Sequence, residues 1–366
     1  MKKTILATLL ISSLNGWSQA GAPANPYYNG FDFNLTGMAL KSALATKITD
    51  THTRLLNYAE AENAIRYTDL DPADNTNQNI FLVYGYSPEI CPIVSVDNTA
   101  HRRRDKDDDG TGGCQWNREH TYAKALGNPD LGTEGPGADV HHVRPADVSR
   151  NDTRGSRKFA TGSGNSSVVG AYWYPGDEWK GDIARMMMYM YLRYGTQCLP
   201  KNVGVGNVLA IDANMIDLFL QWNADDPVSA VEDRRNTYLG NANNFYGQGN
   251  RNPFIDNPYL ATRIWGGPAA QNRWPNVFLA NEAFDWYSLV SVAPNPSSNG
   301  HINISSPKPI DAIQVISLNG QIVSEIQNPT AVTDDHQYTL SHLPSGFYLL
   351  KLSVENQVII KKIAVQ

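Results

Sequence analysis

Two stretches decide how the middle of this chain folds: residues 114–127, CQWNREHTYAKALG, and residues 139–159, DVHHVRPADVSRNDTRGSRKF. We expect "NREHT" in the first stretch to be a strand or the end of one. In the second stretch, "DVHHVRPAD" is predicted to be a strand and "DVSRNDTRGSRKF" a helix. A strand–strand–helix unit places a residue of the first strand opposite a residue of the helix, so the two stretches would complete one site.

Glu119, on the first strand, and Asn151, on the helix, are the residues that this unit would bring together. Their oxygen atoms would share one hard cation, and oxygen is the ligand type that Mg²⁺ prefers, with Mn²⁺ as an alternative ion. Water and a substrate oxygen would fill the remaining positions, which suits phosphate chemistry. His120 points to the other face of the strand, where it would take a proton from an attacking water.

Basic residues crowd the segment around Asn151, although the whole chain has a net charge of −6. A basic patch beside a metal is typical of a site for a polyanion backbone, and the alternative is a solvated helix face. Arg154 lies one helical turn from Asn151, which makes it our candidate for holding a phosphate. The patch comprises Arg144, Arg150, Arg154, Arg157 and Lys158.

Two further histidines, His141 and His142, are adjacent in the predicted second strand. Neighbouring side chains of a strand face opposite ways, so both cannot line the site. We expect His141 to face the site, because it shares the parity of Asp139, and to orient the base or a phosphate. His142 would then be a packed structural histidine.

Residues 1–20 have the features of a secretory signal peptide. Lys2 and Lys3 precede the apolar run TILATLLISSL, and Ser18 and Ala20 are small residues at the positions that a signal peptidase reads. The apolar run is too short to span a bilayer. We therefore expect an exported protein with no membrane span.

The rest of the chain predicts an α+β protein in two parts. Residues 21–283 are helix-rich, with a wide apolar helix face at residues 180–195, KGDIARMMMYMYLRYG. Residues 284–291 are predicted to form a linker. Residues 292–366 contain short β-rich runs separated by turn signals such as the Asn-Gly of "LNGQ", which predicts a small β-sandwich.

Export gives the cysteine count a structural meaning. The chain has three cysteines, so at most one disulfide forms and one thiol is left over. We favour Cys91 with Cys114, which leaves Cys198, although the sequence does not decide the pairing.

The segment DKDDDGTGG begins like a calcium-binding loop, with Asp105, Asp107 and Asp109 at alternate positions. The glutamate expected at the twelfth position of such a loop is replaced by Trp116. Bound Ca²⁺ would brace the approach to Glu119, and the alternative is a solvated acidic turn.

Four motifs in the order NREHTYAKALG, DVHHVRPADVSRNDTRGSRKF, WKGDIARMMMYMYLRYG and QGNRNPFIDNPYLATRIW resemble the endonuclease I family of secreted bacterial nucleases. Those enzymes have the ββα-metal (His-Me finger) fold. The resemblance implies that His120 is the general base and that Glu119 and Asn151 ligate magnesium. It assigns no product-binding arginine, because the stretch between His120 and Asp139 is short and glycine-rich. The residues for which it implies a structural role are Asp182, Arg185, Asn250, Arg251, Asn252 and Asp256.

The C-terminal part resembles a different kind of module. Its segments APNPSSNG, SLNGQIV, LPSGFYLLKL and KKIAVQ are similar to the C-terminal sorting domain of type IX secretion substrates. This resemblance implies that residues 292–366 contact the secretion machinery and direct the protein across the outer membrane, to the cell surface or the medium.

Together these features predict a secreted, metal-dependent endonuclease that cleaves DNA, with RNA as a further substrate, and that acts as a monomer. Binding would be to backbone phosphates, because no element suggests readout of base edges. One alternative is a ribonuclease or phosphodiesterase of narrower range. Another is an inactive surface module that binds nucleic acid or glycan, although the complete set of Glu119, His120 and Asn151 argues against it.

Overall fold

The chain divides into two compact units, residues 1–275 and residues 276–366. The structure, a computed structural model, describes residues 22–85, 102–112, 114–278, 290–306, 308–333, 336–354 and 357–366. The predicted signal peptide lies outside these ranges, as does the predicted linker apart from its last two residues. The β-rich part begins with strand β9 at Ser291, close to the start predicted at residue 292.

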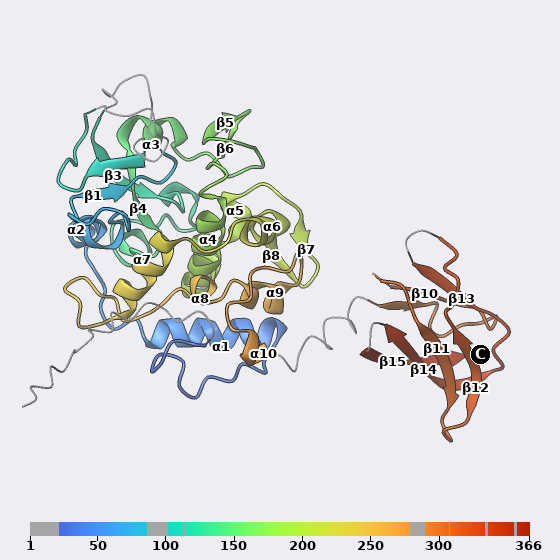
Figure 1. The fold of residues 1–366 in the computed structure, drawn as a ribbon. Helices are drawn as coiled ribbons and strands as arrows, with labels where there is room; N and C mark the ends of the chain where they lie inside the picture. Colours follow the sequence, from blue (N-terminus) through green and yellow to red (C-terminus); the bar gives the residue numbers. More distant parts are fainter. Residues whose placement is uncertain are drawn as a thin grey trace, which may run out of the picture. The chain divides into compact units, whose positions relative to one another are not determined.

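Helices contain more of the described residues of the first unit than strands do, and they surround the nearly fully buried α4 (Figure 1). This helix contacts α1, α5, α6 and α8. The sequence predicted it from its wide apolar face, and it ends at Gly195, whose φ of 56° lies in the left-handed region. The α-helices of this unit are α1 (Gly37–Asp50), α2 (Tyr58–Thr68), α3 (Val148–Arg154), α4 (Lys180–Tyr194), α5 (Pro200–Val203), α6 (Asp217–Asp225), α7 (Ala230–Gly240), α8 (Pro253–Asp256) and α9 (Tyr259–Trp265), and α10 (Pro275–Phe278) follows at the boundary.

The strands of the first unit form antiparallel pairs, which are β1 with β2, β3 with β4, β5 with β6, and β7 with β8. Among the described residues, three short 3₁₀ helices lie between these strands. The strands are β1 (Asn79–Phe81), β2 (Arg103–Asp105), β3 (Trp116–His120), β4 (Val143–Asp147), β5 (Ser167–Val169), β6 (Tyr172–Tyr174), β7 (Val208–Leu209) and β8 (Asp212–Ile216), and the 3₁₀ helices are η2 (Lys124–Leu126), η3 (Gly135–Ala138) and η4 (Gly195–Cys198).

The predicted strand–strand–helix order is present as β3, β4 and α3. The last residue of β4, Asp147, is also the N-cap of α3, because its Oδ1 accepts a hydrogen bond from the backbone N–H of Arg150 at 3.0 Å. Both elements are shorter than predicted. His141 and His142 form a turn before β4, and α3 stops before Gly155, whose φ of 51° does not continue a helix.

Buried ion pairs hold β4, α4 and the loop after α2 together. Arg144 on β4 donates to Asp69 at 2.6 Å and to Asp182 on α4 at 3.1 Å, and all three side chains are fully buried. Arg185, one turn further along α4, binds both carboxylate oxygens of Glu232. The positions of Asp182 and Arg185 thus agree with the structural role that the family resemblance implies.

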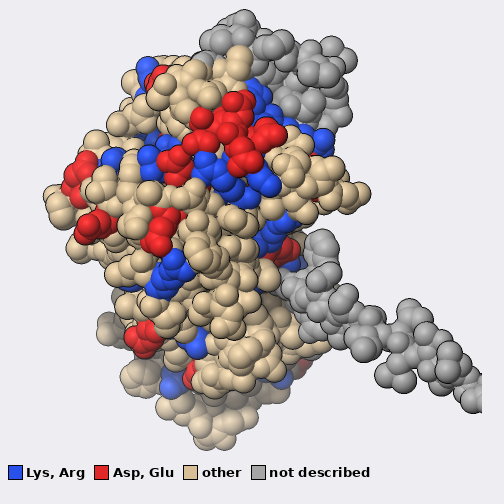
Figure 2. Space-filling model, turned by 90° about the vertical axis from the view of Figure 1, so that its left-hand side faces the viewer, with Lys and Arg blue, Asp and Glu red and all other residues tan. Residues whose placement is uncertain are grey.

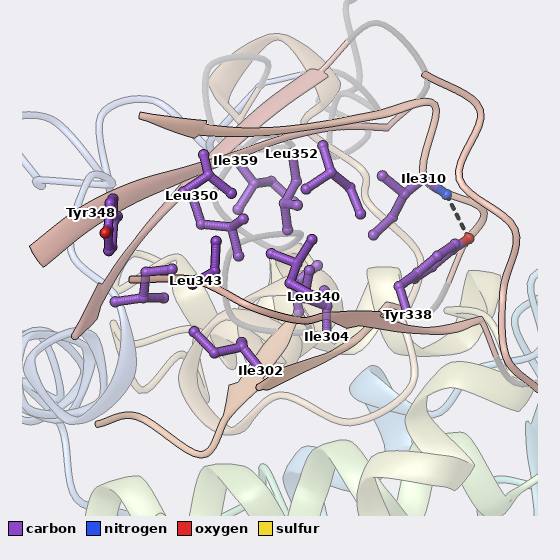
Figure 3. Packing of buried hydrophobic residues seen from close by; sticks show 14 of the residues in the cluster. Ile302, Ile304, Ile310, Tyr338, Leu340, Leu343, Tyr348, Leu350, Leu352 and Ile359 are labelled. Carbon is purple, nitrogen blue, oxygen red and sulfur yellow. Dashed lines mark hydrogen bonds between the residues drawn. The ribbon is translucent and has the colours of Figure 1, made fainter. Parts of the chain in front are cut away.

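The second unit consists of two antiparallel sheets with an apolar core between them. One sheet has the order β13-β10-β9, and the other has the order β12-β11-β14-β15. Ile302, Ile304 and Leu340 from one sheet point toward Leu350 and Leu352 from the other (Figure 3). The strands are β9 (Ser291–Ala293), β10 (Ile302–Ser305), β11 (Ala312–Ser317), β12 (Ile322–Gln327), β13 (Gln337–Leu340), β14 (Gly346–Val354) and β15 (Gln357–Val365). The sandwich predicted from short β-rich runs and turn signals is therefore present.

The cysteines agree with one disulfide and one thiol. Cys114 is disulfide-bonded, and Cys198 is a buried free thiol. The predicted partner Cys91 lies outside the described residues. Within the described ranges, the structure has no helix long and apolar enough to cross a membrane.

Candidate active site on β3 and α3

Strand β3 presents Asn117 and Glu119 on one face, because side chains alternate along a strand. Helix α3 packs against this face through contacts that include two between side chains. Asn151 Nδ2 donates to Asn117 Oδ1 at 2.7 Å, and Arg154 Nη1 lies 3.0 Å from Glu119 Oε1. The helix therefore brings Asn151 to the side of the strand that carries Glu119.

Both Glu119 and Asn151 keep an oxygen that accepts no hydrogen bond from a described residue. Glu119 is 2% exposed, and its Oε1 accepts from the hydroxyl of Tyr84 at 2.9 Å and faces Arg154, which leaves Oε2. Asn151 uses its Nδ2 as a donor to Asn117 and to the carbonyl of Arg118, which leaves Oδ1. One carboxylate oxygen and one amide oxygen are thus available to a hard cation.

The charge state of Glu119 is set by opposing effects. Burial raises its pKa to about 7, while the Arg154 guanidinium and the Tyr84 hydroxyl act in the opposite direction. A metal ion requires the carboxylate form of its ligand. Arg154 and Tyr84 therefore favour the form that a metal would bind.

His120 is held with one ring nitrogen engaged and the other available. Its Nε2 lies 2.9 Å from the carbonyl oxygen of Gly137 on η3, so Nε2 carries the proton and Nδ1 is an acceptor. Burial, and then the neighbouring His142, Lys124 and Arg118, lower the pKa of His120 to about 3. The imidazole is therefore neutral at pH 7, as a general base requires.

The turn before β4 places the ring of His142 near His120, where the ring of His141 was predicted to lie. The His142 ring lies 5.7 Å from the ring of His120, and its Nε2 donates to the carbonyl of Pro136 at 2.7 Å. His141 packs against Tyr189, with its Nε2 3.1 Å from the carbonyl of Asn250. The prediction failed because strand parity does not apply to residues in a turn.

Arg154 does not have the predicted role of a phosphate ligand. It is 1% exposed, and its guanidinium donates to the carbonyls of His120 and Thr121 besides pairing with Glu119. A substrate phosphate cannot replace these partners without opening the packing of α3 on β3. Arg154 is instead the residue that fixes the carboxylate of Glu119.

The basic patch is also smaller than predicted, since Arg144 is buried in ion pairs as well. Arg157 and Lys158 are half-buried and donate to backbone carbonyls. On the face of the molecule in Figure 2, basic side chains lie among acidic ones, and the acidic side chains gather in a group near the top. The fold pairs many of its cations, which a count of arginines in the sequence does not reveal.

Three residues that the sequence did not single out complete the surroundings. Tyr84 binds Glu119, Tyr58 at the start of α2 stacks on the His120 ring at 5.7 Å, and Lys124 lies 5.3 Å from the Tyr58 ring. Of these three residues, Lys124 alone lies near a predicted site residue in the sequence, four residues after His120.

No group of three or more His, Cys, Asp or Glu side chains that could hold a metal occurs among the described residues. In the acidic loop, Asp109 pairs with Arg66 at 2.5 Å and Asp107 lies 3.6 Å from the same side chain. Asp105 accepts from the backbone N–H of Asp107 at 2.9 Å. The arrangement adds no support to the calcium prediction.

A cavity of about 440 Å³ lies elsewhere in the first unit, between α6 and the segments around residues 161–162 and 205–209. Its charged lining groups are satisfied within the protein: Asp217 accepts from Asn207 at 2.9 Å, and Lys180 lies 3.6 Å from Asp225. The cavity contains none of the residues that converge on β3 and α3. The site is therefore assigned by its chemistry and not by the size of a cavity.

Comparison with known proteins identifies both parts of the chain. Residues 36–259 match the family described as Endonuclease I, and residues 291–366 match the family described as Secretion system C-terminal sorting domain. An extracellular ribonuclease of Bacillus amyloliquefaciens is 40% identical over 241 residues, covering 63% of this chain and 75% of the relative. An extracellular ribonuclease of Bacillus subtilis (strain 168) is 39% identical over 261 residues, covering 67% and 82%.

Among solved structures, a match is found to PorZ, a surface component of the type IX secretion system of Porphyromonas gingivalis. It has 12% identity and a TM-score of 0.19, and it covers 24% of this chain and 12% of that one, so it carries no argument. The two family matches and the two ribonuclease relatives support the assignment to a family. The chain belongs to the endonuclease I family, as a secreted or cell-surface nuclease with a C-terminal type IX sorting domain.

Proposed function

We propose that the protein is a Mg²⁺-dependent endonuclease that hydrolyses phosphodiester bonds of DNA and also of RNA, with water as the nucleophile. One observation carries the proposal. His120 is a neutral imidazole whose Nε2 is fixed by the Gly137 carbonyl and whose Nδ1 is available, directly beside Glu119 in the chain. A fixed, unprotonated ring nitrogen is what the abstraction of a proton from water needs.

Glu119 Oε2 and Asn151 Oδ1 would hold the metal ion. They fit Mg²⁺ because both are oxygen donors without a partner among the described residues, and because α3 places them on one face of β3. When bound, Mg²⁺ would stabilise the charge that develops on the phosphate and on the leaving oxygen. Arg154 and Tyr84 would keep the carboxylate of Glu119 ionised and oriented for this task.

His120 would accept the proton of the attacking water at Nδ1. An anion near an imidazole raises the pKa of the ring, so a bound phosphate would bring the pKa of His120 from about 3 toward the working pH. The Gly137 carbonyl holds the ring during this step and favours the protonated form. The unit of β3, β4 and α3 would then act as a ββα-metal motif.

The choice between DNA and RNA follows from the nucleophile. Attack by water does not use the 2′-hydroxyl, so both polymers would be cut. A ribonuclease is the second candidate, and the name of the two relatives, extracellular ribonuclease, favours it. Both DNA and RNA would be substrates, because the proposed base and metal ligands act only on the phosphodiester group that the two polymers share.

Plasmid DNA and a long RNA, each digested with Mg²⁺, with Mn²⁺ and with excess EDTA, test the proposal. We expect cleavage of both polymers with Mg²⁺ and none in EDTA. His120→Ala should lower the rate about a hundredfold to ten-thousandfold, and Glu119→Gln and Asn151→Ala should raise the Mg²⁺ concentration needed. His141→Gln is the control, because His141 lies away from the base. Cleavage that persists in EDTA would refute the metal mechanism, and cleavage of RNA alone would establish the second candidate.

A further inference from the structure

The described cations around β3 and α3 are mostly engaged within the protein. Arg118 pairs with Glu62 at 3.0 Å and donates to the backbone carbonyl of Tyr58 at 2.7 Å. Arg154 is buried against Glu119. A nuclease site needs a cation that can reach a substrate phosphate, and neither arginine is available for it.

Lys124 differs from these arginines. It lies on η2, four residues after His120, and it is half-buried. Its Nζ lies 5.3 Å from the centroid of the Tyr58 ring, and this nitrogen makes no hydrogen bond or ion pair with any described residue.

The Tyr58 ring contacts both His120 and this cation. His120 stacks on it at 5.7 Å with an interplanar angle of 15°. The Arg118 guanidinium lies 3.8 Å from the same ring centroid, and Lys124 lies 5.3 Å from it. One aromatic side chain at the start of α2 thus contacts the base, an engaged cation, and a cation with no hydrogen-bond or ion-pair partner among the described residues.

We propose that Lys124 contacts a non-bridging oxygen of the scissile phosphate, and that Tyr58 is the positioning residue that holds Lys124 beside His120. The inference rests on the proposed function, because it takes His120 as the base. An ammonium group is a compact point charge with three donors, so it can follow a phosphate whose geometry changes during attack. Lys124 takes the place in the site that the sequence assigned to Arg154.

The test uses the full chain with Lys124→Gln and Lys124→Arg. The matched control is Lys47→Gln. Lys47 is also half-buried, and its Nζ lies 4.9 Å from the ring centroid of Tyr27 and makes no hydrogen bond or ion pair with a described residue. Lys47 is on α1, far from β3 and α3 in the first unit (Figure 1). Binding of a fluorescein-labelled DNA duplex is measured in EDTA at several salt concentrations, and kcat and KM are measured with Mg²⁺.

We expect Lys124→Gln to lower kcat/KM about tenfold to hundredfold, as for a hydrogen bond to a charged group. The slope of log binding constant against log salt should become less steep by about 0.9, the value for one phosphate contact. Lys124→Arg should restore the slope, and Lys47→Gln should match the wild type. An unchanged slope and rate in Lys124→Gln would overturn the contact.

Tyr58 is tested by Tyr58→Phe and Tyr58→Leu. The phenylalanine variant keeps the ring and should retain the wild-type salt slope and rate. The leucine variant should have a less steep salt slope and a lower rate. Equal behaviour of the two variants would overturn the positioning role. His120→Ala, measured in parallel, separates two failures. An inactive His120→Ala protein with an unchanged Lys124→Gln overturns the Lys124 contact alone. A fully active His120→Ala protein overturns the proposed function.

Discussion

The interiors of the two units differ in how many charged side chains they bury. The first unit buries charged side chains in pairs, such as Arg144 with Asp69 and Arg154 with Glu119. In the described part of the second unit, the buried polar residues are Ser297 and Ser306, and its core is a cluster of Val, Ile, Leu and Tyr side chains. Ile310 N donates to Tyr338 Oη at 2.9 Å at the edge of this cluster (Figure 3).

This difference reflects what each interior has to do. An apolar core stabilises a fold through removal of surface from water, with little demand on the direction of each side chain. A buried ion pair adds little net stability compared with an apolar replacement, but removal of one partner leaves a charge without compensation. In the first unit such a pair fixes the direction of Glu119, and a candidate metal-binding carboxylate needs a fixed direction.

The largest expected effect is on the buried pair at the site. Arg154→Met leaves Glu119 without its cation, so we expect the first unit to lose about 3 to 5 kcal/mol of stability, as for one partner of a buried pair. Guanidinium denaturation followed by tryptophan fluorescence measures this loss. Arg157→Met, at a half-buried position just beyond α3, should change stability by less than about 0.5 kcal/mol. An Arg154→Met protein of wild-type stability would mean that the pair is not formed.

The second effect tests the apolar interior. Leu350 is fully buried on β14, and Leu350→Ala should cost the second unit about 2 to 5 kcal/mol through the cavity it leaves. Phe347 on the same strand is 69% exposed and provides the control Phe347→Ala. Hydrogen–deuterium exchange of peptides from residues 290–366 should speed up in Leu350→Ala alone. Faster exchange in peptides of the first unit as well would show that the two interiors are coupled.

The sequence predicted the elements of both interiors better than their polar contacts. A wide apolar face predicted the helix at residues 180–195, and β-rich runs separated by turn signals predicted the sandwich, because both signals are local in the sequence. The partner of Arg144, Asp69, lies far from it in sequence, and no local pattern joins the two. The parity argument for His141 needed a strand where the chain forms a turn.

The third effect concerns a buried neutral histidine. Burial lowers the pKa of His141 to about 4, against 6.5 for an exposed histidine. Between pH 6.5 and pH 4 the imidazole of His141 is therefore protonated more readily in the unfolded chain than in the folded one. Its contribution to the free energy of unfolding is complete above pH 6.5 and falls as the pH decreases toward 4. The loss amounts to roughly 2 to 3 kcal/mol by pH 4. Unfolding of His141→Gln at pH 7 and pH 4.5 should show a smaller difference than the wild type, and an equal difference would contradict the assignment.

The smallest effect is expected from removal of the second unit. A chain that ends at Phe278 keeps every residue assigned to the site, and the second unit contributes none of them. Its kcat/KM on plasmid DNA should therefore stay within about twofold of the wild type, a difference of roughly 0.4 kcal/mol in transition-state stabilisation. The salt slope of duplex binding should also be unchanged, since the proposed phosphate contact, Lys124, lies in the first unit. A shortened chain that is folded by circular dichroism but has a much higher KM would show that the sandwich binds substrate. The surface of the second unit would then take part in substrate binding, and the assignment of substrate binding to the first unit alone would be wrong.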